Sequence, residues 1–251
     1  MIAGVGSIGL GALLAACGSG GSTPVTTSTG STATITPQAA SGDLTALFES
    51  SGTCTLTAST TQGPYYFDAD KIRSDIREDR PGKRLDVAIR VRDSETCEPL
   101  KDAVVEIWHC DAGGNYSGAE SQSAGRPGGG GTGDLVPTDD HRYLRGAQVT
   151  NAEGIVTFTT IWPGWYRGRT VHIHAMVHVG QDRTLTTQMM FDEALNDVVM
   201  AAEPYTGRGE RDTRNENDSI FRSGMVMKTV AAADGYQGAI TFNVDPDHDG
   251  V

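Results

Sequence analysis

Hydrophobic and polar residues alternate with a period of two along several short stretches of this chain. The clearest stretch sets four aliphatic positions against charged ones: Leu85, Val87, Ile89 and Val91 against Asp86, Arg90 and Arg92. Successive side chains of a strand point to opposite faces of a sheet, so this pattern predicts a half-buried strand. Further stretches predict strands at residues 103–109, 147–150, 155–160, 171–179, 184–191, 225–230 and 239–244.

Helical periodicity is confined to one short stretch, residues 193–202, and the charged residues 75–83 predict a loop. The glycine-rich run 124–134 lacks the Lys-Ser or Lys-Thr pair of a phosphate-binding loop, so we expect a surface loop there. Short strands separated by Gly, Pro and Asn are typical of a β-sandwich. We therefore predict an all-β fold, a β-sandwich with long loops and little helix.

The N-terminal residues 1–16 are small and apolar, too few to span a bilayer, and they lead into Leu-Ala-Ala-Cys, which ends at Cys17. This ending is typical of a bacterial lipoprotein signal, in which Cys17 becomes the lipidated N-terminus. An ordinary secretory signal that contains a cysteine is the alternative. No Lys or Arg precedes Lys71, so the basic start of such signals is missing. We expect an exported protein, lipid-anchored to the cell membrane or otherwise secreted.

Residues 18–43 consist largely of Gly, Ser, Thr and Pro and carry almost no charge. Such a composition buries too little apolar surface to offset the entropy lost on ordering, which predicts a flexible linker. About 200 residues follow, enough for one domain with its own core. The predicted organisation is a signal at 1–17, a linker at 18–43 and a single folded domain at 44–251.

Acidic residues outnumber basic ones by 32 to 20, for a net charge of −12. This excess argues against nucleic acid as a partner and suits an exported protein. Export also favours a disulfide among Cys54, Cys97 and Cys110. If residues 103–109 form a strand, Cys97 and Cys110 lie at its opposite ends, roughly 20 Å or more apart, whereas a disulfide needs Cα atoms about 6 Å apart. We expect Cys54 to pair with Cys97 or Cys110.

Two histidines, His172 and His174, lie two residues apart in a predicted strand, so both project from one face and can reach one metal ion. The competing interpretation is a strand with polar residues on its solvent face. His178 lies on the same face and suggests a three-histidine zinc site. It is four residues from His174, about 13 Å along a strand, which is too far for a shared ion with bonds of about 2 Å.

Four motifs surround these histidines in a familiar order. They are TQGPYY (61–66), IWHCDAGGNYSG (107–118), the run from 143 to 174 that contains WPGWYRGRTVHIH, and LTTQ (185–188). In this order they make residues 56–244 resemble the catalytic domain of the intradiol ring-cleavage dioxygenases, a family that includes catechol, hydroxyquinol and protocatechuate dioxygenases. The agreement rests on four separated motifs, so it is far more specific than one short pattern.

The resemblance implies a mononuclear non-haem Fe(III) with four protein ligands: Tyr116, Tyr166, His172 and His174. It further implies that substrate displaces Tyr166 from the iron, that Arg169 lies beside the substrate and that Gln188 assists Arg169. A hard ferric ion favours phenolate oxygens, and metal binding removes the tyrosine proton well below its usual pKa of about 10. The chain departs from the family pattern in lacking the catechol dioxygenases' N-terminal helical region and in a glycine-rich insertion before Tyr166, which leaves oligomeric state and pocket shape open.

The activity that the resemblance implies is cleavage of a catechol-type diol by O2 to a cis,cis-muconate-type diacid. The partners would then be a small aromatic diol and O2, with no nucleic acid and with the membrane contacted only through the lipid anchor. One alternative is an enzyme that prefers hydroxyquinol or protocatechuate. Another is a non-catalytic β-sandwich binding module that keeps the fold without the iron.

Overall fold

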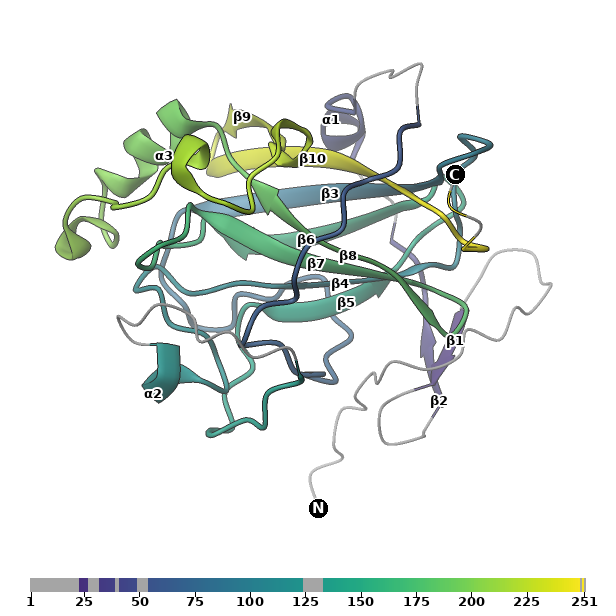
Figure 1. Ribbon diagram of the computed structural model, residues 1–251, viewed down its shortest axis with the longest axis horizontal. Coiled ribbons are helices and arrows are strands. Elements are labelled where there is room, and N and C mark those ends of the chain that lie inside the picture. The colour runs from purple at the N-terminus through teal and green to yellow at the C-terminus, as the bar shows by residue number, and fades with distance from the viewer. Residues whose placement is uncertain are drawn as a thin grey trace.

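The computed structural model describes residues 23–26, 32–38, 41–48, 54–123, 133–248 and 250. Two four-stranded sheets pack face to face, and a separate two-stranded ribbon lies near the N-terminus (Figure 1). The predicted all-β sandwich is therefore confirmed. Cys17 and its signal, together with residues 124–132 of the glycine-rich run, lie outside the described residues.

The first sheet has the order β6-β3-β10-β9. Its strands are β3 (Arg84–Asp93), β6 (Ile155–Ile161), β9 (Lys228–Ala232) and β10 (Gly235–Val244). The two central strands, β3 and β10, run parallel and pair along their whole length, while β6 and β9 pair antiparallel at the edges. The alternating pattern at 85–91 thus lies in a strand, as the sequence predicts, and the structure places that strand at the centre of the sheet.

The second sheet has the order β5-β4-β7-β8 and is antiparallel throughout. Its strands are β4 (Val104–Trp108), β5 (Arg145–Val149), β7 (His172–Val179) and β8 (Asp182–Met190). On β7, alternate residues from Ile173 to Val177 enter the core between the sheets. His172 and His174 alternate with these core residues, so their side chains project from the other face of the sheet.

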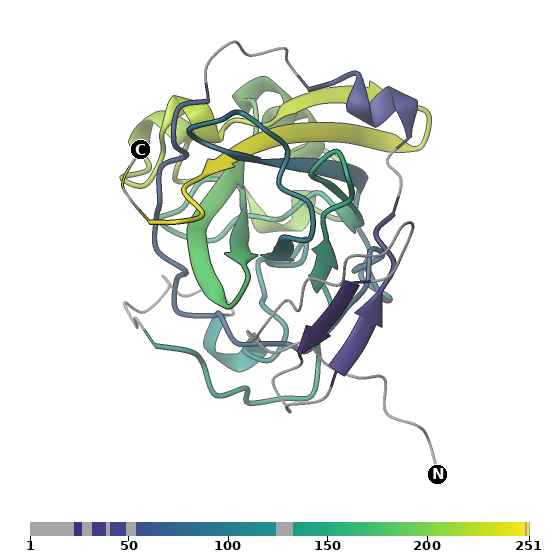
Figure 2. The ribbon, with the colours of Figure 1, turned by 90° about the vertical axis from the view of Figure 1, so that its right-hand side faces the viewer.

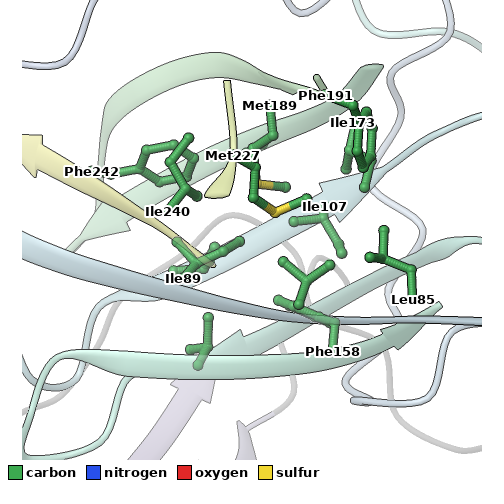
Figure 3. Packing of buried hydrophobic residues seen from close by; sticks show 14 of the residues in the cluster. Leu85, Ile89, Ile107, Phe158, Ile173, Met189, Phe191, Met227, Ile240 and Phe242 are labelled. Atoms are coloured by element: carbon green, nitrogen blue, oxygen red, sulfur yellow. The ribbon is translucent and has the colours of Figure 1, made fainter. Parts of the chain in front are cut away.

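The core fills the space between the two sheets with aliphatic, aromatic and methionine side chains. Figure 3 shows Leu85 and Ile89 of β3 and Phe158 of β6 near Ile107 of β4, with Phe242 beside Ile240 at the left end of the cluster. Each such side chain that leaves water completely contributes about 1.5–3 kcal/mol to stability. The core lies on one side of the second sheet, so its other face is free to carry polar chemistry.

The N-terminal ribbon pairs β1 (Thr23–Thr26) with β2 (Thr32–Ile35), and Figure 2 shows it beside the sandwich. This differs from the flexible linker expected over residues 18–43. Val25 and Ile35 are buried in one cluster with residues of the second sheet: Val104, Ala147 and Val149. The two apolar side chains of these threonine-rich strands pack against the second sheet. Composition alone does not predict this contact.

Helices are short and lie outside the sheets: α1 (Gly42–Thr45), α2 (Glu120–Ser123), α3 (Glu193–Met200) and three turns of 3-10 helix at Thr206–Arg208, Asn215–Asn217 and Ser223–Met225. Asp192 caps α3 by accepting from the backbone N–H groups of Ala194 and Leu195. The predicted strand at 225–230 was wrong in its start, because the 3-10 turn occupies its first residue and β9 begins at Lys228. Within the described part of the chain, no helix has the length and apolarity needed to cross a membrane.

A disulfide joins Cys54 to Cys97, with Cα atoms 5.5 Å apart, and Cys110 is a buried free thiol. This agrees with the expected pairing of Cys54. From Cys54 the chain runs alongside β8: Thr60 N–H donates to the carbonyl of Thr186, and Thr187 Oγ1 donates to the carbonyl of Ala58. The disulfide therefore anchors the start of a stretch that leads to the outer face of the second sheet.

Candidate metal centre

Two tyrosines and two histidines converge on the outer face of the second sheet. Tyr116 comes from the loop after β4, Tyr166 from the loop before β7, and His172 and His174 from β7 itself. The hydroxyl of Tyr166 lies 3.0 Å from His172 Nε2, which lies 3.1 Å from His174 Nε2. The Tyr116 ring is 5.9 Å from that of Tyr166 and 6.2 Å from that of His174, centroid to centroid. All four side chains are buried.

The strand register fixes both imidazoles. His174 is directly opposite Trp108 on β4, and their rings stack 4.9 Å apart at an interplanar angle of 9°. The Nδ1–H of His172 donates to the carbonyl of Thr170 over 2.7 Å, which leaves the lone pair on Nε2. Metal-binding histidines commonly have a backbone carbonyl in this role.

Both histidines are neutral in this setting. Burial, and then the positive charge of Arg169, hold the pKa of His172 and of His174 well below the ordinary histidine value. A neutral imidazole keeps a lone pair for a metal ion, so burial and Arg169 both favour the form of the two histidines that can act as ligands.

The two phenols are also poised for a cation. The hydroxyl of Tyr116 is buried and has no hydrogen-bond partner among the described residues. Burial, and then neighbouring Tyr166, raise the pKa of Tyr116 well above its ordinary value, and burial raises that of Tyr166. A bound multivalent cation reverses this preference by stabilising the phenolate. An orphaned hydroxyl beside two imidazole lone pairs therefore fits a hard metal ion.

The tyrosines are what extend the histidine pair into a four-donor site. Across the described ranges, no group of three His, Cys, Asp or Glu side chains is placed to hold a metal ion. His178 lies at the far end of β7, where its register partner is Arg183, which agrees with the geometric argument against a three-histidine zinc site.

The two further residues expected at the site are also there. The Arg169 guanidinium donates through Nη2 to Gln188 Oε1, and its Nη1 lies 3.5 Å from His172 Nε2. Gln188 is directly opposite His174 on the neighbouring strand β8, and its Nε2 lies 3.4 Å from the carbonyl of Thr61. The site thus has a fixed positive charge on one side of the four donors.

Sequence reasoning missed Asp218, which forms a buried ion pair with Arg169: Arg169 Nε donates to Asp218 Oδ2 over 2.9 Å. Asp218 is 49 residues from Arg169, in a loop rich in charged residues. No motif distinguishes it from its acidic neighbours, so only the three-dimensional contact could identify it.

One wall of the site is the segment that begins at the disulfide. Gly63 has a positive φ of 75°, and a Cβ built on it would lie 3.1 Å from His174 Cε1. Only glycine meets both the backbone and the space requirement. Two residues on, the Tyr65 ring packs 4.8 Å from that of Tyr116. The TQGPYY motif therefore serves as a close cover over the donor atoms.

The buried guanidinium of Arg145 ties this wall to the Tyr116 loop. Its Nη2 donates to the carbonyls of Tyr65 and Ser117 over 2.8 and 2.9 Å, and its Nε donates to Ser117 Oγ over 3.0 Å. Burial lowers the pKa of Arg145 to about 10, so the group keeps its charge at neutral pH. We interpret Arg145 as the residue that holds the two loops in register around the site.

Tyr66 and Glu106 form a second buried polar pair next to Trp108. Tyr66 packs against Trp108 with ring centroids 4.8 Å apart and ring planes tilted by 53°, and its hydroxyl donates to Glu106 Oε2 over 3.1 Å. Burial, and then the negative charge of Asp68, raise the pKa of Glu106 from 4.5 to about 8. Glu106 is consequently a proton-bearing carboxyl at neutral pH, and not a charged one.

Replacing Glu106 by glutamine is expected to change how stability depends on pH. Between about pH 4.5 and 8 the folded protein retains a proton that the unfolded chain releases, so the free energy of unfolding falls as pH rises, by up to about 1.4 kcal/mol per pH unit. Glu106→Gln removes this slope. Urea unfolding of both proteins across that range measures it, and parallel pH profiles would contradict the assignment.

Comparison with known proteins indicates the same family as the sequence motifs. Residues 61–233 match the family model described as "Dioxygenase". A chlorocatechol 1,2-dioxygenase of Rhodococcus opacus is 27% identical over 161 residues, which cover 54% of this chain and 56% of that protein. The chain spans about half the length of the curated relatives that it matches.

Two solved structures extend the likeness to most of the described chain. An intradiol ring-cleavage dioxygenase from Tetranychus urticae superposes with a TM-score of 0.72 at 35% identity, covering 78% of this chain and 97% of that one. The dioxygenase domain of a dioxygenase carbohydrate-binding protein fusion from Streptomyces sp. SirexAA-E has a TM-score of 0.56 at 29% identity, covering 76% and 98%. The motifs, the sandwich and these matches agree, and the chain belongs to the intradiol ring-cleavage dioxygenase family.

Proposed function

We propose that this domain binds one non-haem ferric ion and cleaves catechol-type aromatic diols with O2. The four ligands are Tyr116, Tyr166, His172 and His174. The ring opens between its two hydroxylated carbons, and both atoms of O2 enter the product, a cis,cis-muconate-type diacid. The observation that supports this best is the convergence of two buried phenols with two neutral imidazoles beside Arg169. Family membership adds to it, because enzymes of this family use non-haem iron.

The donor set suits a ferric ion. Two phenolates offset much of its charge and favour the trivalent state, while the imidazoles complete the set with neutral nitrogens. When bound, the ion supplies the Lewis acidity that holds the diol as a dianion and makes its ring reactive toward O2.

The protein's own groups then handle protons and charge. The diol loses two protons when it binds as a dianion. Tyr166 Oη, as a phenolate, would accept one of them and return to the neutral phenol that burial favours, and a solvent-derived hydroxide would accept the other and leave as water. Arg169 offers a fixed positive charge to the anionic ring, and Gln188 keeps that charge aimed at it. The buried side chains of the site keep bulk water away, which strengthens each of these interactions.

We also propose that the protein is exported from the cytoplasm and anchored to the cell membrane through a lipid on Cys17. The disulfide between Cys54 and Cys97 supports an oxidising compartment, because such bonds form and persist there. Ring cleavage would then act on aromatic diols met outside the cell.

The decisive experiment is the visible absorption spectrum of the iron-loaded domain, recorded before and after anaerobic addition of catechol. A broad tyrosinate-to-iron band that moves to longer wavelength with catechol is the expected result, followed by muconate formation when O2 is admitted. A colourless protein that retains no iron would overturn the proposal in favour of a binding module. A coloured protein that cleaves hydroxyquinol or protocatechuate but not catechol would move the substrate to those rings.

A further inference from the structure

Asp218 is the buried carboxylate that forms an ion pair with Arg169 of the candidate site. Its side chain is 0% exposed and that of Arg169 is 16% exposed. Oδ2 accepts from Arg169 Nε and from the backbone N–H of Thr170, both over 2.9 Å, and Oδ1 accepts the backbone N–H of Ile220 over 2.9 Å. Both carboxylate oxygens are occupied, so Asp218 has one orientation and imposes it on the guanidinium.

A chain of hydrogen bonds fixes the loop that carries Asp218. Glu193, the first residue of α3, accepts the backbone N–H of Asn215 over 2.7 Å. Asn215 accepts from Thr170 Oγ1 over 2.7 Å and donates to the carbonyl of Phe191 over 2.8 Å. The loop is thus attached at both sides: to α3 and to the residues that lead into β7.

The nitrogens of the Arg169 guanidinium have different partners. Nε is committed to Asp218, and the two terminal nitrogens are left to face Gln188 and His172. A guanidinium next to a bound metal ion would be repelled by the charge of that ion, and the carboxylate on the far side of the guanidinium offsets this repulsion. Removal of one partner of such a buried pair leaves the other charge uncompensated.

We propose that Asp218 is the positioning residue for Arg169: it holds the guanidinium toward the diol that the metal centre would bind. The proposal rests on the function proposed above, since it assigns how that site keeps its positive charge aimed. The Asp218 carboxylate accepts from Arg169, Thr170 and Ile220 and forms no hydrogen bond with any of the four candidate ligands, so it acts through Arg169.

The test is a double-mutant cycle on the iron-loaded protein with catechol as substrate. Asp218→Asn is nearly isosteric but has one acceptor oxygen for three donors. It is expected to lower kcat by about 10- to 100-fold, while the tyrosinate-to-iron band and the anaerobic dissociation constant of catechol, read from that band, stay near wild type. In an Arg169→Met background the same change is expected to cost less than about twofold, because the residue it acts through is gone.

A matched control lies on the same loop. Asp212 Oδ1 accepts the backbone N–H of Gly168 over 3.1 Å, and its Oδ2 lies 3.8 Å from Arg167 Nε, whereas it forms no hydrogen bond or ion pair with Arg169. Asp212→Asn is expected to leave kcat within about twofold of wild type. If Asp218→Asn fails to fold, Asp218→Glu replaces it, because it keeps the charge but moves the carboxylate by one methylene.

The outcomes separate the two proposals. An unchanged kcat in the Asp218 variant, or an equal loss with and without Arg169, would overturn the positioning role. A wild-type protein with no iron band and no ring cleavage would instead overturn the proposed function, whatever the variants do.

Discussion

Replacement of Tyr116 by phenylalanine is expected to abolish ring cleavage and to remove most of the visible absorption of the iron-loaded protein. The hydroxyl has no hydrogen-bond partner among the described residues, so its loss disturbs little in the metal-free fold. It removes one of two anionic oxygens from the proposed ferric site. Loss of several kcal/mol of charge stabilisation corresponds to a rate lower by at least about 10³-fold. Catechol-dependent O2 uptake and the absorption spectrum measure the two effects.

Tyr143→Phe is the matched control for that experiment. Tyr143 is equally buried, but its hydroxyl donates to Glu120 over 2.7 Å, outside the group of four donors. It should keep both the colour and the activity. A Tyr116 variant that retains full colour and turnover would show that this residue is no ligand.

Arg169→Met is expected to lower kcat by about 10²- to 10³-fold while iron remains bound. The change preserves the apolar stem and removes the positive charge next to His172 and Gln188. The pKa of both histidines is held down partly by that charge, but burial is the larger cause, so both stay neutral and available. Steady-state kinetics and the iron content of the purified variant distinguish loss of chemistry from loss of metal.

The neighbouring Arg167 supplies the control, because its side chain is 74% exposed and pairs only loosely, at 3.8 Å, with Asp212. Arg167→Met should keep the wild-type kcat. Equal losses in the two variants would mean that general surface charge, and not the fixed guanidinium, supports the reaction.

The strands and the histidine pair were predictable because both depend on local periodicity. The aliphatic positions between Leu85 and Val91 alternate in sequence and enter the core in the structure. The two-residue spacing of His172 and His174 has the same physical basis, and it places both rings on one face. The motifs follow the same order along the chain as in the family they resemble, and this was enough to assign Tyr116, Arg169 and Gln188 to one site.

The contacts that sequence reasoning missed are made between distant loops. Asp218 is one of 32 acidic residues, and its role depends on a loop path that no periodicity encodes. Glu106 reads as a charged residue inside an apolar strand, yet the fold places Tyr66 against it and buries both. The β1–β2 ribbon escaped because two apolar side chains in a threonine-rich segment are too weak a signal until the surface they cover is known.

The strand β7 contributes both to the core and to the candidate metal centre, with Ile173, Ala175 and Val177 on one face and the two histidines on the other. A single inserted or deleted residue within it would exchange the faces, placing imidazoles among the aliphatic side chains and an isoleucine among the donor atoms. Folding and catalysis would fail together. We therefore expect β7 to tolerate substitutions but no change in its length, so that insertions and deletions are accommodated only in the loops.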